Sequence, residues 1–315
     1  MKKELLQLIY LFKHWKHTQD ISKSKEFKAE REKAEIIRLV HSIEKGLSLE
    51  KPRLGFGVKK INTLLDYYDS YSKEFGNDTF CLLMVYDAIA EYVNFHKKKE
   101  YMHNDFINIC NRFYLINHAE KSNEKFGGTL PIDSPVQNID FNTLKNFFMS
   151  RHSIRDFKAE NVSNQDIYEA VKVAQLSPSA CNRQAVRAYV MSSQKLCDLY
   201  GDNLEGIGGF ANNADKFILI TGKISAYRME EYNQYIVSAS VFATYLMLAL
   251  HAKNIGSCII QRPLQYSKQW QFMQKKCNIP ADEQLVLMLA VGIVQDKYRA
   301  PISKRFPTEN ILKYI

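Results

Sequence analysis

The sequence predicts an α+β protein in which an all-helical N-terminal region precedes a central mixed or antiparallel sheet flanked by helices. Two observations lead to this prediction. In the first part of the chain, apolar residues recur at helical spacing. Beyond residue 140, helical segments alternate with apolar strand-like runs, which is typical of layered sheet architectures. A chain of 315 residues is also long enough for about two domains.

Four amphipathic segments are expected to be helices in the first part: 34–46, 58–71, 80–95 and 105–119. Lys45 and Gly46 indicate a C-terminal cap for the first of them. Asp78 can cap the third at its N-terminus. The segment 121–140 is rich in Gly and Pro and has little periodicity, so we expect a linker there. The predicted domains are therefore 1–120 and 141–315.

The second domain should contain a helix capped by Ser163, followed by three strands at 187–192, 216–222 and 284–294. Its most apolar stretch is 236–252, which has 17 residues. A confident membrane span needs about 20, so we expect no transmembrane segment. A helix that is apolar all round is usually buried in a core or at an oligomer interface.

Composition restricts the function. The net charge is +9, but acidic and basic residues are interspersed and the longest basic run is Lys97–Lys99. This pattern favours small anionic ligands over a nucleic-acid partner. The six cysteines stand singly, without metal-ligand spacing, so we expect no metal site and a reducing cytoplasmic location. Glu4 and Gln7 interrupt the N-terminal apolar run, which argues against a signal peptide.

Two short segments hold the candidate site. The first, SRHSIRDF from Ser150, contains the donors Arg151, His152, Ser153 and Arg155, which suit a phosphate or a pyrimidine edge. The alternative is a solvated helix end with a charged loop. The second, SPSACNRQ from Ser177, is a loop of small residues between a helix and a strand. A plain helix stop is the alternative there.

These segments, together with the two later segments 251–261 and 303–312, occur in the order found in the nitroreductase family, which the chain resembles from about residue 141 to its end. The resemblance implies a nitroreductase-like fold that binds flavin mononucleotide (FMN). It also implies a homodimer, formed through the central apolar helix, in which each FMN is shared by two copies of the chain. The expected activity is a ping-pong reduction of a small organic acceptor by NADH or NADPH.

The resemblance also implies the cofactor-binding residues. Arg151 and Arg305, with Lys304, would hold the phosphate, and Arg suits this role because its planar fork donates two parallel hydrogen bonds. His152, Ser153 and Arg155 would follow the ribityl chain and the pyrimidine edge. The second segment would reach the partner's flavin, through Pro178, Ser179, Ala180, Cys181, Asn182 and Gln184.

In the third segment, the resemblance implies that Gly256 ends the central helix and that the backbone of Ile259, Ile260 and Gln261 faces the flavin. The flavin ring would carry the chemistry, so no catalytic side chain is predicted. The chain departs from common family residues at Gln261 and, in the central helix, at Ser238, Thr244 and Tyr245. The alternative hypothesis is therefore a noncatalytic, partner-binding protein with a degenerate flavin domain.

The run 41–57 is the most distinctive part of the helical region. It can be a structural helix-turn-helix joint. Alternatively, Lys45, Arg53 and Phe56 form part of a lid or of a pocket for an anionic substrate.

Overall fold

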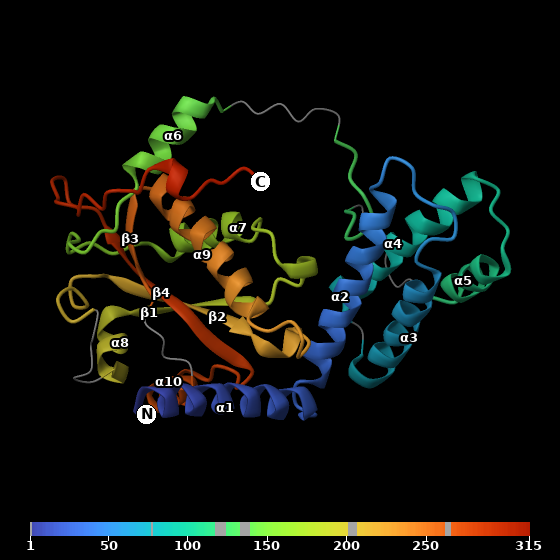
Figure 1. Cartoon of the computed structure of the whole chain (residues 1–315), viewed down its shortest axis with the longest axis horizontal. Helices are drawn as coiled ribbons and strands as arrows, with labels where there is room; N and C mark the ends of the chain where they lie inside the picture. Colours follow the sequence, from blue (N-terminus) through green and yellow to red (C-terminus); the bar gives the residue numbers. More distant parts are fainter. Residues whose placement is uncertain (1, 77, 117–123, 133–138, 201–206, 262–265) are drawn as a thin grey trace.

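The computed structural model describes residues 2–76, 78–116, 124–132, 139–200, 207–261 and 266–315. Figure 1 shows a helical domain on one side, a sheet domain on the other, and a long first helix beneath the sheet domain. The described elements are α1 (Lys2–Lys23), α2 (Lys28–Leu47), α3 (Val58–Phe75), α4 (Thr79–Lys98), α5 (Asn104–Tyr114), α6 (Phe141–Ser150), α7 (Asn164–Ala174), η1 (Ala180–Asn182), β1 (Val186–Ser192), α8 (Ser193–Tyr200), β2 (Lys216–Lys223), η2 (Ile224–Ala226), α9 (Gln234–Ala252), β3 (Ile255–Ile260), α10 (Lys268–Cys277), β4 (Glu283–Ile293) and η3 (Thr308–Asn310).

Helices α2 to α5 share one core. In α2 the buried residues recur every three or four positions, and Ile36, Val40 and Ile43 are fully buried against α3, α4 and α5. The Asp78 carboxylate accepts a hydrogen bond from Cys81 N at 3.1 Å, which confirms the predicted cap of α4. The described part of the predicted linker packs on this domain, where Phe126 N donates to Asp87 Oδ2 at 2.7 Å.

The predicted cap at Gly46 is wrong, because α2 continues to Leu47. Gly46 is needed there for close packing: a Cβ at this position would lie 2.1 Å from Cε2 of Phe56. The Phe56 ring packs against Tyr92 and His96 in the helical core, and its carbonyl accepts a hydrogen bond from Tyr92 Oη at 2.8 Å. Within the run 41–57, Phe56 thus has a structural role, since it packs between α2 and α4.

The second domain is a four-stranded antiparallel sheet with the order β1-β2-β4-β3. Side chains of β2 alternate between its two faces, as strand geometry requires. Ile218 and Ile220 pack with α7 and α9, whereas Phe217 and Leu219 pack with α8 and α10. Both faces of the sheet are therefore covered by helices, as Figure 1 shows for α7 and α9.

Helix α9 is the core helix of this domain. Ala239, Ala243, Leu246 and Leu250 are fully buried against the sheet and α7. By length and composition, α9 is the one helix in the described part of the chain that could cross a membrane. It ends at Ala252, and Asn254 adopts the left-handed conformation with φ 58°. The predicted helix end at Gly256 is wrong, because Gly256 lies inside β3 and pairs with Gly292 of β4.

Helix α1 packs on the sheet domain, although it stands first in the chain. His14 Nδ1 lies 2.5 Å from Tyr266 Oη, and His17 Nε2 lies 3.2 Å from Gln284 Nε2. Ile21 and Phe27 belong to the same hydrophobic core as α7 and α9. In the sequence, the helical domain (α2 to α5) thus lies between α1 and the remainder of the sheet domain.

Candidate functional site

The first predicted segment lies against the outer edge of the sheet. It follows α6, and Ser153 pairs in parallel with Ser257 of β3, so that Ile154 N donates to Ser257 O at 3.0 Å. Gly256 makes this approach possible, since a Cβ there would lie 3.2 Å from Cβ of Ile154. Ile154 is buried, whereas His152 and Arg155 are exposed and Arg151 is half-buried. The donors of the segment therefore remain at the surface.

The charges of this segment gather around the end of α9 and the start of β3. Burial lowers the pKa of His251, and the positive charge of Arg151 lowers it further. Burial raises the pKa of the Cys258 thiol, an effect that Arg155 opposes. Neither Arg151 nor Arg155 makes an ion pair with any residue that the structure describes, and Arg155 donates only to Ser153 O at 3.4 Å. Two guanidinium groups are thus free to bind an anion.

The second segment forms a tight loop between α7 and β1. Cys181, Asn182 and Gln184 have φ values of 52°, 55° and 51°, a left-handed conformation that is costly for residues other than glycine. Two hydroxyl groups hold the loop: Ser179 Oγ accepts from Gln184 N at 3.0 Å, and Ser238 Oγ accepts from Ala180 N at 3.5 Å. Strained backbone of this kind often occurs at functional sites.

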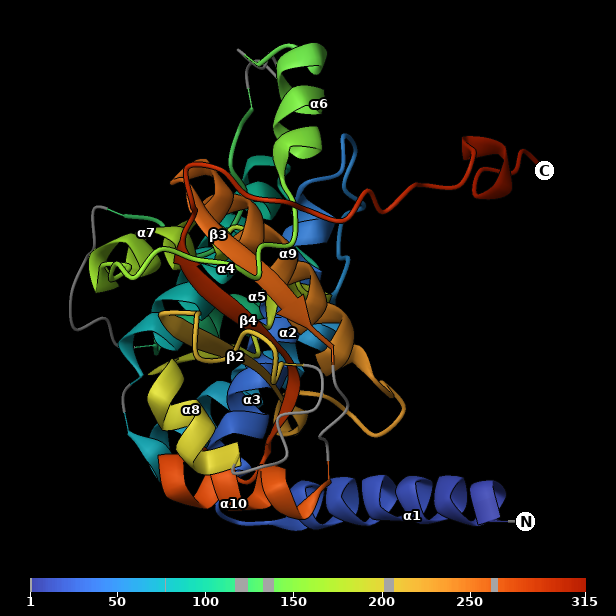
Figure 2. The ribbon, with the colours of Figure 1, turned by 90° about the vertical axis from the view of Figure 1, so that its left-hand side faces the viewer.

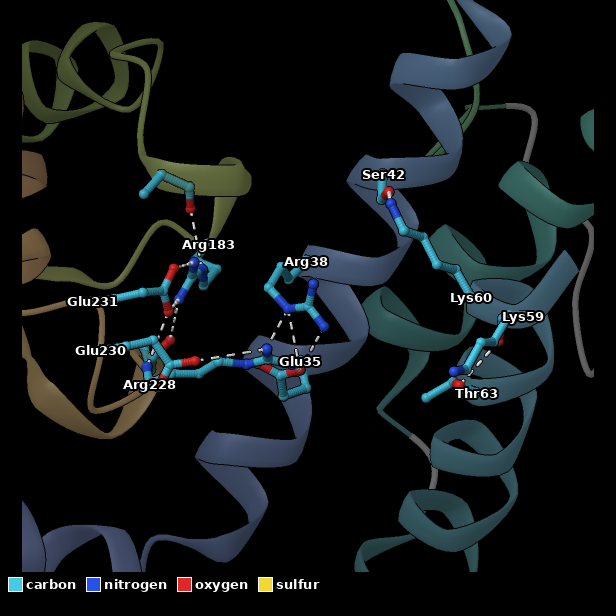
Figure 3. Close-up of polar contacts among 12 residues, drawn as sticks. Glu35, Arg38, Ser42, Lys59, Lys60, Thr63, Arg183, Arg228, Glu230 and Glu231 are labelled. Atoms are coloured by element: carbon cyan, nitrogen blue, oxygen red, sulfur yellow. Dashed lines mark hydrogen bonds and ion pairs between the residues drawn. The ribbon is translucent and has the colours of Figure 1, made fainter. Parts of the chain in front are cut away.

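Arg183 fixes this loop from below, and Figure 3 shows its contacts. Its side chain is 1% exposed and forms a bidentate ion pair with Glu231. It also donates to Ala180 O at 3.2 Å and to Ala226 O at 2.9 Å, and its guanidinium lies 4.7 Å from the centre of the Tyr227 ring. The hydrogen bonds from Arg183 lower the pKa of Glu231, against the effect of burial.

An ion pair next to Arg183 joins the loop to the helical domain. Arg228 N donates to Glu231 Oε2 at 3.0 Å, and the Arg228 guanidinium pairs with Glu35 of α2 at 2.5 Å. Arg38 binds the same Glu35 carboxylate at 2.8 Å. Burial would raise the pKa of Glu35, but its hydrogen bonds to Arg228 and Arg38 lower it. Figure 3 shows this chain of charges between the two domains.

The two predicted segments lie toward opposite ends of α9 within one chain. Ser150 Oγ, at the start of the first segment, is 2.8 Å from His251 Nε2, whereas Ala180 of the second segment contacts Ser238. Ser238 and His251 are thirteen positions apart in α9, which corresponds to about 20 Å at about 1.5 Å per residue. A single chain therefore does not bring the two segments together.

The remaining predicted residues lie elsewhere. Pro178 is exposed in the loop after α7, Ile259 and Ile260 end β3 with Ile260 buried, and Gln261 is exposed directly after the strand. Lys304 and Arg305 belong to a C-terminal segment in which every residue from 301 onward is exposed. Figure 2 shows this segment extending away from the body of the molecule.

A cavity between the two domains adds residues that the sequence analysis missed. It has a volume of about 230 Å³ and adjoins the second segment at Ser179 and Gln184. Its other walls come from Lys33 and Phe80 of the helical domain and from Arg187 of β1. These positions are too far apart in the sequence for a local pattern to connect them. The one sequence signal is that a cation, Arg187, stands at the start of the predicted strand 187–192. No group of three His, Cys, Asp or Glu within the described ranges is placed to hold a metal ion.

Comparison with known proteins gives a match to one family model over part of the chain. Residues 148–206 and 200–293 match the model of the nitroreductase family. The comparison with curated proteins gives no match. Among solved structures, the chain is similar to an FMN-dependent nitroreductase from Clostridium difficile R20291 at 24% identity and a TM-score of 0.42, over 50% of this chain and 91% of that one.

Two further solved structures have similar coverage. A nitroreductase family protein from Streptococcus pneumoniae TIGR4 is 21% identical, with a TM-score of 0.43 over 55% of this chain and 100% of that one. A BluB-like flavoprotein from Clostridium difficile 630 is 20% identical, with a TM-score of 0.43 over 55% and 98%. The match to the family model covers α7 to β4 and the first predicted segment. Residues 148–293 thus match the nitroreductase family, and α2 to α5 form a helical domain outside the matched part.

Proposed function

We propose that the protein is an FMN-dependent oxidoreductase that uses NADH or NADPH to reduce a small organic acceptor, at a site shared by two copies of the chain. The observation behind this proposal is that two guanidinium groups, Arg151 and Arg155, have no carboxylate partner among the described residues and lie on the edge of the nitroreductase-family sheet. Side chains that hold a fold together are normally paired, so free donors on a rigid strand edge favour an anionic ligand.

The residues of this segment fit FMN. Arg151 can bind the phosphate with two parallel hydrogen bonds, and its half-buried position restricts its side chain. His152, Ser153 and Arg155 then follow the ribityl chain and the pyrimidine edge, where positive charge stabilises negative charge on the ring. When bound, FMN would take two electrons and a proton from the nicotinamide and deliver them to the acceptor in a ping-pong reduction. The chain itself positions both molecules.

A second copy would supply the rest of the site. The loop formed by Pro178, Ser179, Ala180, Cys181, Asn182 and Gln184 would reach the partner's flavin, and the backbone of Ile259, Ile260 and Gln261 would border its own. Because the C-terminal segment leaves the body of the molecule, we assign Lys304 and Arg305 to the phosphate bound by the other copy.

Three exposed apolar surfaces support such a dimer. On α9, Val237, Val241 and Leu248 lie on one face at helical spacing, and Val237 is 54% exposed. Helix α6 stands away from the body without a buried residue, with Phe141 and Met149 exposed. The C-terminal segment exposes Phe306 and Ile311 in the same way. Apolar surfaces of this kind usually mark interaction sites.

We also propose a cytoplasmic location, which the thiols support. All six cysteines are free, which suits a reducing compartment such as the cytoplasm.

Purification and reduction test the cofactor and the donor. The protein should be yellow, or become yellow with added FMN, and NADH or NADPH should bleach it without oxygen. Colourless protein that takes up no FMN would contradict the proposal. Protein that takes up FMN and is reduced by neither nucleotide would favour the noncatalytic alternative.

A charge on the exposed face of α9 tests the dimer. Val237→Glu should leave the monomer folded, because the side chain is already largely exposed, but it should halve the mass in solution and release FMN. Met102→Glu, at a 70% exposed residue of the helical domain, is the control and should change neither. A wild-type protein that is monomeric and keeps its FMN would rule out the shared site.

A further inference from the structure

The cavity between the two domains has the features of a ligand site. Its volume of about 230 Å³ is slightly below the range of about 300–1,000 Å³ that is usual for ligand pockets, so only a small molecule fits. The helical domain, the loop before β1, β1 itself and α9 all contribute walls. The lining residues are Lys33, Ile37, Phe80, Gln175, Ser177, Ser179, Arg183, Gln184, Val186, Arg187, Ser238 and Phe242.

Ion pairs between the domains hold the walls in place. Glu35 of α2 binds Arg228, and Glu30 of α2 binds Lys223 at the end of β2 at 2.7 Å. Lys223 is largely buried, with a side chain that is 10% exposed. Since both contacts lie on the helix that carries Lys33 and Ile37, the helical wall cannot move independently of the sheet domain.

The lining combines apolar surfaces with hydrogen-bond donors. Ile37 and Phe242 are buried, and Phe80 is 45% exposed at the rim. Gln175 and Gln184 carry amide groups, and Ser177 and Ser179 carry hydroxyl groups that can donate. None of the described lining residues is Asp or Glu. A flat apolar molecule with an anionic group fits this distribution.

Of the three cations that line the cavity, Arg187 is the one without a carboxylate partner in the described part of the chain. Lys33 is bound to Asp78 at 2.5 Å, and Arg183 is bound to Glu231. Arg187 donates through one nitrogen to the carbonyls of Val186 at 2.7 Å and Gln184 at 3.4 Å, and it pairs with no carboxylate among the described residues. Its remaining donors are therefore available to a ligand.

A second cavity has a volume of about 550 Å³, but none of the described cations that line it is available to a ligand. It lies between α1, α2 and η2 and is lined by charges of both signs. Lys28 pairs with Glu32 and Glu74, and Glu35 pairs with Arg228, while Arg31 donates to Ile21 O and Ser24 O. Its cations are thus occupied by contacts with other described residues, within the helical domain for Lys28 and between the domains for Arg228.

We propose that the cavity between the domains binds a small, flat organic anion, with the anionic group on Arg187 and the apolar ring between Phe80 and Phe242. The cavity adjoins Ser179 and Gln184, which we assign to the partner's flavin. We therefore assign this anion to the acceptor class, an assignment that rests on the proposed function, whereas the binding site rests on the cavity alone. The helical domain then serves as one wall of the acceptor site.

Calorimetric titration with benzoate tests the binding site directly. The FMN-loaded wild type should bind benzoate and should bind benzyl alcohol, which has the same ring without the charge, at least tenfold more weakly. Arg187→Gln should weaken benzoate binding about tenfold to a hundredfold, as expected for one charge-assisted hydrogen bond. Lys195→Gln removes an exposed cation on α8, outside the cavity, and should leave binding unchanged.

The apolar wall has its own test. Phe80→Ala should weaken benzoate binding about threefold to tenfold, through loss of an aromatic contact. Met102→Ala is the matched control in the helical domain. Equal binding of benzoate and benzyl alcohol, or full benzoate affinity in Arg187→Gln, would overturn the proposal. The wild-type comparison of the two ligands decides the question even if a variant does not fold.

Kinetics test the assignment to the acceptor. Benzoate should compete with 4-nitrobenzoate, raising its KM without changing kcat, and Arg187→Gln should raise the same KM while reduction by NADH or NADPH stays unchanged. Benzoate that binds without competing would restrict the proposal to a binding site. If the protein takes up no FMN, the proposed function fails, yet titration of the flavin-free protein with benzoate still decides whether the cavity binds an anion.

Discussion

The arginines near the two ends of α9 differ in their partners. At one end, Arg183 is buried and paired with Glu231, and Arg228 is paired with Glu35. At the other end, Arg151 and Arg155 make no ion pair within the described part of the chain. The first pair holds a strained loop and joins two domains, whereas the second leaves its donors at the surface.

This difference separates charges that stabilise the fold from charges that can bind a ligand. A buried guanidinium needs its carboxylate and carbonyl partners, because an uncompensated buried charge is very costly. A surface guanidinium without partners contributes little to stability. Substitutions at the two ends should therefore affect different measurements, which the following predictions use.

The largest effect is expected at Arg183. Arg183→Ala should lower the free energy of unfolding by about 3 kcal/mol, the lower end of the range for breaking a buried ion pair, since Glu231 is partly exposed. Urea denaturation measures this loss. Arg187→Ala, four residues further on, is the matched control and should change stability by about 0.5 kcal/mol or less, as is usual for surface sites. Equal losses in the two variants would remove the distinction between paired and free arginines.

The next effect is expected at Arg151. Arg151→Gln should leave the melting temperature of the flavin-free protein unchanged and raise the Kd for FMN about tenfold to a hundredfold, because a charged hydrogen bond to phosphate is lost. Fluorescence titration of FMN measures this Kd. Lys195→Gln, at an exposed cation of α8, should leave it unchanged. A variant that melts early but binds FMN normally would give Arg151 a structural role.

Acid should reduce the stability that comes from the ion pair of Arg183 with Glu231, by a smaller amount than Arg183→Ala does. Since Arg183 holds the pKa of Glu231 below its ordinary value of 4.5, the stability from this pair is fully present above pH 4.5. It is lost as the pH falls below 4.5, through the lower pKa of the folded state. Glu231→Gln should therefore destabilise the protein near neutral pH, and the difference from wild type should shrink on acidification. Urea denaturation at several pH values measures it, and a constant difference would contradict the assignment.

The smallest effect is expected at Arg228. Its side chain is 46% exposed, so Arg228→Gln should lower the free energy of unfolding by only about 0.5 kcal/mol. Because Arg228 joins the two domains, its removal should also speed the exchange of amide hydrogens where α2 contacts the sheet domain. Hydrogen exchange followed by mass spectrometry measures this rate. Unchanged exchange at α2 would show that Arg228 does not couple the domains.

Local sequence signals predicted most of the fold. The three predicted strands agree with β1, β2 and β4 to within one residue at each end, because apolar runs and turns determine them locally. The predicted cap Ser163 is confirmed by its hydrogen bond to Asp166 N at 3.0 Å. Glycine was misleading twice: Gly46 and Gly256 were assigned to helix ends, but each serves close packing that only the tertiary structure reveals.

The candidate site was less predictable. The segment from Arg151 to Arg155 could be proposed from the sequence because its donors are adjacent, and its role remains a prediction. The residues of the cavity were missed, because Lys33, Phe80 and Arg187 come together only when the helical domain packs on the sheet domain. The pairing of Arg183 with Glu231 was missed for the same reason, since a residue spacing of 48 has no sequence signature.

The position of α1 has a consequence for biosynthesis. Its contacts with Tyr266 and Gln284 join residues 252 and 267 positions apart. During translation, α2 to α5 can fold as a unit, whereas α1 must wait until the last strand of the sheet has emerged from the ribosome. Until then the Ile21 side chain of α1, which is only 5% exposed in the folded protein, remains accessible to chaperones. The sheet domain can therefore complete its fold only after nearly the whole chain has been synthesised.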